Sequence, residues 1–391
     1  MDKRVYLLTI VSFVVGMVEL IIGGILDIVA ADLGVKIQEA GLLISVFSIV
    51  FALAAPILLA ATANVERKKL TLISLLVFFI GNGIAIISPS YSVLMIARIV
   101  SAASGSLLVV LCVTLASNIV SEAYRARAIG VIFMGVSGSL VLGVPVGLML
   151  GNAFGWRAPF ILIAVLTIFS MANVYFFMGR IAPKPGMPML QQLKTLKNKK
   201  ILYAQLTSFL FLTGHLTLYG YLTPFVKETM GLGGTWVSII YLIFGVAAVA
   251  GGGIGGTLAD KFGTKPSIIG IIIVFGLSML VIPQTTFMLP LFLVVMAIWG
   301  MLSWAITPAQ QSYLIESSPG SSDIQQSLNN SALHLGIALG SSIGSVVIGR
   351  ASIEFNPIVG ASFIVLALFT AILSMRQKEN HSEAVELSHQ A

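Results

Sequence analysis

One carboxylate stands out because it lies inside an apolar run. Glu19 is the acid in the stretch FVVGMVELIIGGIL, residues 13–26. Burying a charge at the centre of a membrane helix costs about 3 kcal/mol or more, unless the group is paired, protonated or functional. Removal from water favours the neutral form of a carboxyl group, so a buried glutamate can carry a proton. The chemistry that Glu19 offers is therefore proton transfer.

Arg98 is a second charged residue within an apolar stretch, LMIARIVSAASGS at residues 94–106. An arginine inside a span needs a carboxylate, a carbonyl group or water as its partner. The sequence leaves two roles open for it, one in proton coupling with Glu19 and one that is purely structural.

Aromatic and amide side chains gather in apolar runs of the second half of the chain. A planar ligand would stack on the aromatic faces and hydrogen-bond to the amides. The alternative roles are helix packing, helix-to-helix hydrogen bonds and, for the histidines, proton transfer. The candidates for ligand contact are His215, Tyr219, Trp299, Asn330 and His334, with Tyr221, Trp304 and Asn329 beside them.

Other chemistries find no support in the sequence. The single cysteine, Cys112, excludes thiolate clusters and intramolecular disulfides. No group of ligands has metal-binding spacing, no nucleophile and base are recognisable, and GGGIGG at residues 251–256 lacks the context of a nucleotide site. We therefore expect no metal, no cofactor and no enzymatic activity.

The composition defines the elements that must position these residues. Hydrophobic residues make up 57% of the 391 and charged residues only 9%, and the mean hydropathy is +1.01. Soluble domains carry about 25% charged residues. The chain is therefore predicted to be an all-α integral membrane protein.

Runs of roughly 20 apolar residues are long enough to cross a bilayer as helices. Twelve such spans are predicted, near residues 5–27, 39–61, 70–88, 92–117, 128–150, 158–178, 201–225, 235–258, 266–283, 287–311, 325–349 and 356–375. The first run is too long for the core of a cleaved signal peptide, so we expect it to be retained.

Charge between the spans sets the expected orientation. If the amino terminus is cytoplasmic, most of the 22 Lys and Arg fall in inner segments, as the positive-inside rule requires. Both termini are then cytoplasmic. The basic, proline-containing segment 179–200 is predicted to be a cytoplasmic linker between six-span halves at 1–178 and 201–375, with a cytoplasmic tail at 376–391.

The two halves resemble each other in two separate places. ATANVERKK at residues 61–69 aligns with TLADKFGTK at 257–265, and two glycine ladders align in spans 5 and 11. Spacing of four places each ladder on one helix face, where backbones can approach closely. Two parallel six-span repeats are typical of secondary transporters. The ladder residues are Gly143, Gly147 and Gly151 in span 5, and Gly336, Gly340 and Gly344 in span 11.

The stretch GGTLADKFGTK, residues 255–265, resembles the loop motif of the major facilitator superfamily. The resemblance implies a conformational gate at Gly256, Asp260, Lys261 and Gly263; the alternative is a role in topology and folding only. The first-half copy has Asn64 in place of the acid. GSLVLGVPVGLMLG at 138–151 is similar to a glycine and proline motif of exporters, in which Pro145 would allow the helix to flex.

Further segments look like the bacterial purine base and ribonucleoside efflux pumps, in the drug:proton antiporter branch. They include VELIIGGIL, YRARAIGVIFMG, GHLTLYGYLTPF and SWAITPAQQSYLIE. The resemblance implies a monomeric transporter of the bacterial inner membrane that exports purines in exchange for protons by alternating access. Glu19 is the acid deep in a span and is the expected proton carrier. The alternatives are an exporter of sugars or diverse drugs, and a non-transporting sensor or channel.

Overall fold

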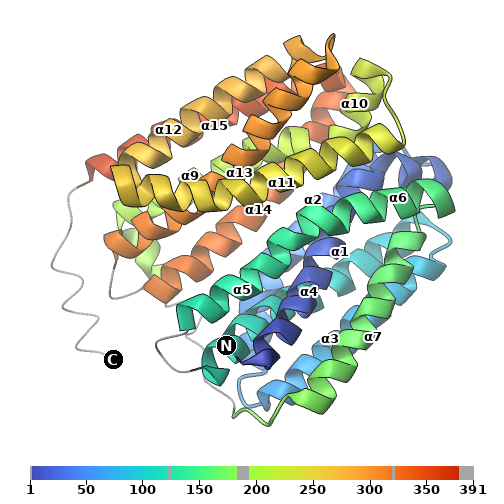
Figure 1. Cartoon of the computed structure of the whole chain (residues 1–391), viewed down its shortest axis with the longest axis vertical. Coiled ribbons are helices and arrows are strands. Elements are labelled where there is room, and N and C mark those ends of the chain that lie inside the picture. Colours follow the sequence, from blue (N-terminus) through green and yellow to red (C-terminus); the bar gives the residue numbers. More distant parts are fainter. Residues whose placement is uncertain (1, 121–124, 183–192, 319–321, 378–391) are drawn as a thin grey trace. The chain divides into compact units, whose positions relative to one another are not determined.

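The computed structural model describes the chain except residues 1, 121–124, 183–192, 319–321 and 378–391. Within the described residues, twelve helices are long and apolar enough to cross a membrane. The predictions of an all-α fold and of twelve spans are confirmed, and the protein is a multi-pass membrane protein (Figure 1).

The helices follow the predicted spans closely. The first six spans are α1 (Lys3–Leu33), α2 (Ile37–Ala61), α3 (Arg67–Ile87), α4 (Tyr91–Ile119), then α5 (Arg125–Gly138) with the π-helix η2 (Ser139–Gly143) and α6 (Val144–Phe154), and α7 (Ala158–Phe177). The remainder are η3 (Thr195–Lys197), α9 (Lys199–Tyr219), α10 (Leu222–Met230), α11 (Thr235–Phe262), α12 (Thr264–Val281), η4 (Ile282–Thr285), α13 (Leu289–Ser317), α14 (Ser322–Arg350), η6 (Ile353–Phe355) and α15 (Asn356–Arg376).

The chain divides into two compact units. The first holds Met1–Gly186 and Gly220–Val246, and the second holds Met187–Tyr219 and Ala247–Ala391. The helix α10 and the beginning of α11 thus belong with α1 to α7.

The helix α1 forms the centre of the first unit. It packs against α2, α4, α5, α6, α7 and α10, and most of its side chains are buried (Figure 1). Its sequence explains this position, because a helix that is apolar on all faces is stable only when its whole circumference is covered by other helices or by lipid.

The glycine ladders lie where helices approach closely, as predicted. A Cβ added at Gly151 would come within 2.9 Å of Ile25, and one added at Gly147 would collide with Ile21. In the second unit, a Cβ on Gly336 or Gly340 would collide with backbone carbonyl groups of α9. Close glycine contacts therefore join α1 to α6 and α9 to α14.

Spans 5 and 7 depart from the continuous helices expected from the sequence. Span 7 breaks between α9 and α10, because Pro224 lacks an N–H group and its ring clashes with the carbonyl group of Gly220 four residues earlier. In span 5, the π-helix η2 ends two residues before Pro145. A π-turn of this kind accommodates a residue that cannot complete the α-helical hydrogen-bond ladder.

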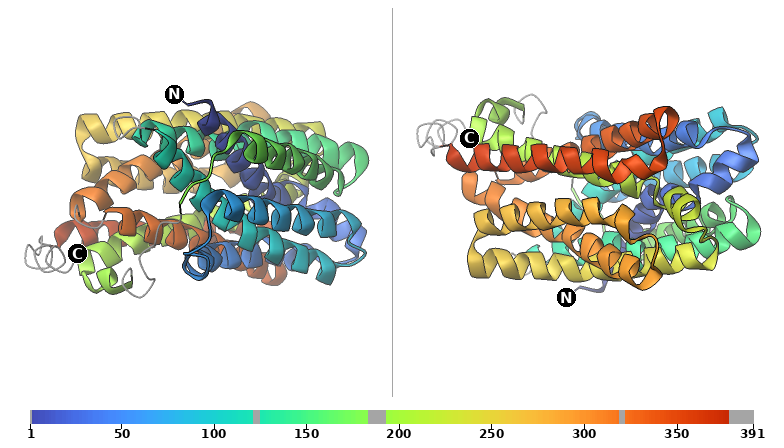
Figure 2. Two further views of the ribbon diagram at one scale, coloured as in Figure 1. Left: turned by 90° about the horizontal axis from the view of Figure 1, so that it is seen from below. Right: turned by 90° about the horizontal axis from the view of Figure 1, so that it is seen from above.

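The helix α9 is the most enclosed element of the second unit. It packs between α14 and α15 and also contacts α13 (Figure 2). Hydroxyl groups fasten the α9 to α15 interface: Ser374 donates to the Lys200 carbonyl group at 2.6 Å, and the Thr207 and Thr370 hydroxyls lie 3.0 Å apart.

Candidate functional site

Glu19 and Arg98 come together within the first unit. Glu19 on α1 is half-buried, Arg98 on α4 is fully buried, and the two charges interact electrostatically. Arg98 Nη1 donates a 2.6 Å hydrogen bond to the carbonyl group of Val18, next to Glu19. A carbonyl group is one of the partners expected for an arginine inside a span. The pair combines an acid that still reaches the surface with a base held inside the bundle.

The helix α1 changes direction six residues beyond Glu19. Ile25 has non-helical backbone angles, so the carbonyl group of Gly24 lies outside the regular helix pattern. Thr223 on α10 donates a 2.9 Å hydrogen bond to that carbonyl group, and Lys227 on α10 forms an ion pair with Asp27. Both contacts lie within the first unit and tie α10 to the kinked end of α1.

The π-helix η2 faces α1 on the other side. Ser139 lies so close to Gly16 that a Cβ on this glycine would collide with its hydroxyl group. A Cβ on Gly143 would likewise collide with Met17. Pro145 is buried in the first turn of α6, which follows η2. The exporter-like stretch thus packs against the turn of α1 that precedes Glu19.

Three of the predicted ligand-contact residues form one aromatic cluster in the second unit. The His215 ring stacks on Tyr219 with centroids 5.2 Å apart, and it lies 4.8 Å from Trp299 on α13. Phe275 on α12 lies 5.6 Å from His215, and Phe211 lies 4.4 Å from Phe275. The cluster offers several adjacent ring faces on three helices.

An amide network lies beside this cluster, toward the start of α9. Asn329 Nδ2 donates to Ser208 Oγ at 2.7 Å and to Gln205 Oε1 at 3.0 Å. Gln205 in turn donates to the Gln325 carbonyl group at 3.0 Å, and Gln310 donates to the Ala204 carbonyl group at 2.7 Å.

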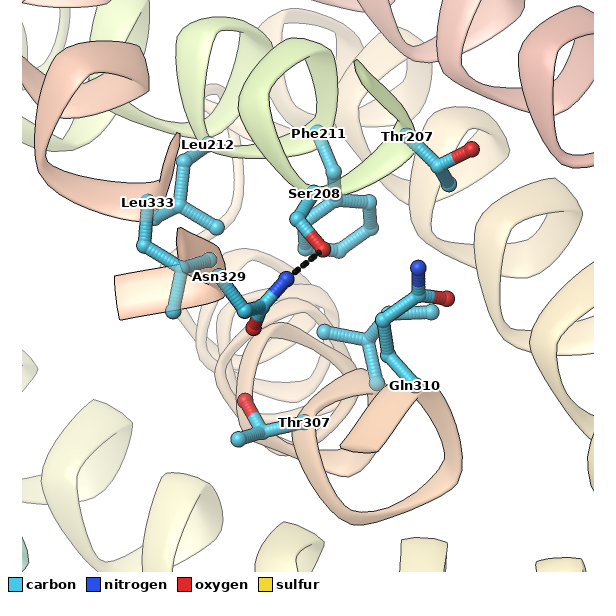
Figure 3. A pocket seen from close by; sticks show the side chains of 9 residues that line it. Thr207, Ser208, Phe211, Leu212, Thr307, Gln310, Asn329 and Leu333 are labelled. Carbon is cyan, nitrogen blue, oxygen red and sulfur yellow. Dashed lines mark hydrogen bonds between the residues drawn. The ribbon is translucent and has the colours of Figure 1, made fainter. Parts of the chain in front are cut away.

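Figure 3 shows Asn329, Ser208 and Gln310 around a small cavity that Phe211 also lines. The volume of this cavity that is open to the centre of a water molecule is about 10 Å³. That is room for about one water molecule. Because Phe211 belongs to the cavity wall and also contacts Phe275, the amide network and the aromatic cluster are continuous.

The remaining predicted contact residues on α14 differ in burial. Asn330 is exposed, whereas the neighbouring Asn329 is buried, and His334 is also buried. Consecutive residues on a helix point about 100° apart, so only one of the two asparagines can face α9.

The four residues of the loop motif lie at the junction of α11 and α12. Gly263 has a φ of +87°, which lets it form the sharp turn between the helices. Asp260 and Lys261 are exposed at the end of α11. Gly256 makes only an ordinary contact, 4.0 Å from its Cβ position to Pro308, whereas a Cβ on Gly255 would collide with the carbonyl group of Ala305.

Glu66, before α3, fastens the chain that follows α7. Its carboxylate accepts 2.9 Å hydrogen bonds from the N–H groups of Lys68, Lys69 and Ile181. Burial alone would raise the pKa of Glu66, but these backbone hydrogen bonds outweigh it and hold the pKa below its usual value. The acid therefore stays ionised and anchors Ile181.

Sequence reasoning missed several of these residues. Phe211, Phe275, Gln205, Ser208 and Gln325 complete the cluster and the network. The spacing of three and four between Gln205, Ser208, Phe211 and His215 was the available signal, because it places them on one face of α9. Phe275 offered no such signal, since it comes from another helix. Within the described residues, no three His, Cys, Asp or Glu gather as a metal site would require.

Comparisons with known proteins agree with this architecture. The sequence profile described as "Major Facilitator Superfamily" matches residues 8–341. The Uncharacterized MFS-type transporter YbcL of Bacillus subtilis (strain 168) is 34% identical over 370 residues, covering 95% of each chain. The Chloramphenicol resistance protein of Streptomyces lividans is 27% identical over 380 residues, covering 95% of this chain and 96% of the relative.

A solved structure shares the fold. It is the bacterial homolog to the human lysosomal transporter Spinster, in an inward-facing and occupied conformation. The TM-score is 0.80 at 15% sequence identity, and the match covers 96% of this chain and 97% of the other.

Proposed function

We propose that this chain, which belongs to the Major Facilitator Superfamily and spans the membrane twelve times, is a proton-coupled exporter of purine bases or ribonucleosides. Its relatives are transporters, and it is a transporter rather than an enzyme. The observation that carries the proposal is the half-buried Glu19 beside the buried Arg98. Exchange of a substrate for a proton requires a titratable group within the spans that can take up and release a proton.

In the proposed cycle, Glu19 takes up a proton from outside as substrate leaves and releases it inside as substrate binds. Arg98 attracts the ionised carboxylate and so favours proton release. Protonation removes that attraction, which gives the two protonation states different preferred conformations.

The aromatic cluster and amide network support a purine-like substrate. Stacking on a ring face contributes about 1–3 kcal/mol per base in nucleic-acid sites. His215, Tyr219 and Trp299 supply such faces, and Asn330 and His334 are proposed to reach the polar edge of the substrate. The cavity at Asn329 is too small for a base, so the amides offer polar atoms rather than volume.

The conformational part of the proposal uses the two sequence halves, 1–178 and 201–375, as the bodies that rock against each other. Gly256, Asp260, Lys261 and Gly263 form the proposed gate, and Pro145 is the proposed point of flexing. The distribution of Lys and Arg supports cytoplasmic termini in a bacterial inner membrane. A monomer suffices for this mechanism.

Inside-out membrane vesicles with an acidic interior test the proposal. Uptake of radiolabelled hypoxanthine and adenosine is measured for wild type, Glu19→Gln and the control Glu354→Gln, which changes an exposed acid of η6. We expect uptake that needs the pH gradient, is abolished by Glu19→Gln and is unchanged by Glu354→Gln. Purine uptake that is insensitive to both the gradient and Glu19→Gln would refute proton coupling.

A drug exporter is the second candidate, because one relative is named a chloramphenicol resistance protein. The same vesicles distinguish the candidates when chloramphenicol and a cationic dye are tested alongside the purines. Uptake of drugs without purines would replace the purine assignment, while leaving the role of Glu19 to be judged by its own variant.

A further inference from the structure

The guanidinium of Arg98 lies in an unusual setting for a buried cation. The side chain is 0% exposed, and its Nη1 donates to the carbonyl group of Val18. Its Nε and Nη2 atoms have no hydrogen-bond partner among the described residues. One hydrogen bond is little compensation for a charge taken out of water, so other contacts must stabilise it.

An aromatic ring provides that contact. The guanidinium carbon lies 3.9 Å from the ring centroid of Phe47, which is buried on α2. A cation this close to a ring face is attracted by the ring quadrupole, and the attraction is strongest where water is excluded. Phe51, one turn further along α2, stacks on Phe47 with centroids 5.7 Å apart.

Few charged groups compete for this guanidinium. The helices packed on α4 are α1, α2, α3 and α5. Glu19 on α1 is the acid whose charge acts on Arg98. The acidic and basic residues of α2, α3 and α5 lie in the first turns of those helices. On α1, Lys3 and Arg4 lie in the first turn, and Asp27 and Asp32 lie near the C-terminal end.

We propose that Phe47 is a positioning residue for proton coupling, whose ring face holds the Arg98 guanidinium beside Glu19. The proposal rests on the proposed coupling function of Glu19. By stabilising the cation without using its remaining N–H groups, the ring leaves Arg98 able to attract the carboxylate when Glu19 loses its proton. A second carboxylate in place of the ring would neutralise the guanidinium and remove that attraction.

The transport test compares Phe47→Leu with Phe51→Leu, which removes a buried ring from the same helix without removing the ring over Arg98. We expect Phe47→Leu to lower gradient-driven purine uptake about tenfold or more, while exchange of labelled for unlabelled substrate is retained. Stepwise fluorination of Phe47 should lower the driven uptake progressively, because fluorine weakens the ring quadrupole at nearly constant shape. Phe51→Leu should lower driven uptake and exchange together or leave both intact.

A thermal-unfolding cycle tests the contact independently of any substrate. Phe47→Leu should lower Tm by about 4 °C more in wild type than in the Glu19→Gln/Arg98→Gln background. Phe51→Leu should lower Tm by the same amount in both backgrounds. Equal costs for Phe47→Leu in the two backgrounds, or no response of driven uptake to fluorination, would overturn the inference. If Glu19→Gln leaves driven uptake intact, the coupling proposal itself fails. If Glu19→Gln lowers driven uptake and Phe47→Leu does not, only the proposed role of Phe47 fails.

Discussion

Gly214 on α9 marks the closest approach of that helix to α15. A Cβ added there would lie 2.5 Å from the carbonyl oxygen of Gly360 and 2.7 Å from Cδ1 of Ile364. Ordinary contacts begin at 3.4 Å, so the helices would have to separate by about 0.9 Å. The hydroxyl contacts at Thr207 and Ser374 resist this movement, because they fasten the same interface.

The Gly214→Ala substitution should therefore destabilise the second unit. Forcing an extra methyl group into a packed interface costs about 1–3 kcal/mol, and the higher helix propensity of alanine returns up to about 1 kcal/mol. A net loss of about 1–2 kcal/mol corresponds to a fall in Tm of roughly 2–8 °C for a unit of this size. His215 follows in the sequence, so the aromatic cluster should shift with the backbone.

Thermal unfolding of purified protein, followed by tryptophan fluorescence, measures this fall. The control is Gly270→Ala on α12, where an added Cβ meets nothing within 4 Å. Gly270→Ala should leave Tm unchanged or raise it slightly, since only helix propensity changes. A Gly214→Ala protein as stable as the Gly270→Ala protein would show that the α9 to α15 contact is more compliant than the structure indicates.

Three further expectations concern polar contacts. Hydrogen bonds lower the pKa of Glu66 in the folded protein, so this residue contributes to stability above the unfolded pKa of 4.5. That contribution is lost as pH falls through the lower folded pKa, and the Tm difference between wild type and Glu66→Ala should therefore shrink below about pH 4.5. Reversing one charge of the Asp27 and Lys227 pair should lower transport activity in vesicles, and exchanging both charges should restore it, whereas the effect on Tm stays small because the pair is partly exposed. Asn329→Leu should cost about 1–3 kcal/mol in unfolding by breaking the network with Ser208, and the neighbouring Asn330→Leu should change stability by less than about 0.5 kcal/mol.

The spans could be predicted because bilayer thickness fixes how many apolar residues a helix needs. The glycine ladders could be predicted because spacing of four defines one helix face. Pro224 also indicated the break near Gly220, four residues earlier in the chain. A prediction based only on the length of the apolar run does not detect this break. The π-helix before Pro145 was hidden for the same reason, since a π-turn changes the backbone pattern without changing hydropathy.

The partners of polar side chains could not be predicted in the same way. Asn329 and Asn330 have the same chemistry and adjacent positions, and only the rotation of α14 against α9 decides which one is buried. Phe47 resembles any other membrane phenylalanine until α2 places it over Arg98. Such contacts depend on how helices distant in sequence are rotated, and no local pattern records that rotation.

The helix α1 connects the proposed coupling residue to the rest of the first unit. One of its faces is held against η2 and α6 by close glycine contacts at Gly143 and Gly147, so lateral movement there would force side chains into backbone. The α1 backbone is kinked at Ile25, and the carbonyl group of Gly24 beside it accepts a hydrogen bond from the Thr223 hydroxyl group of α10. The kink divides α1 into a segment that carries Glu19 and a segment that carries Asp27, and the ion pair of Asp27 with Lys227 links the second segment to α10.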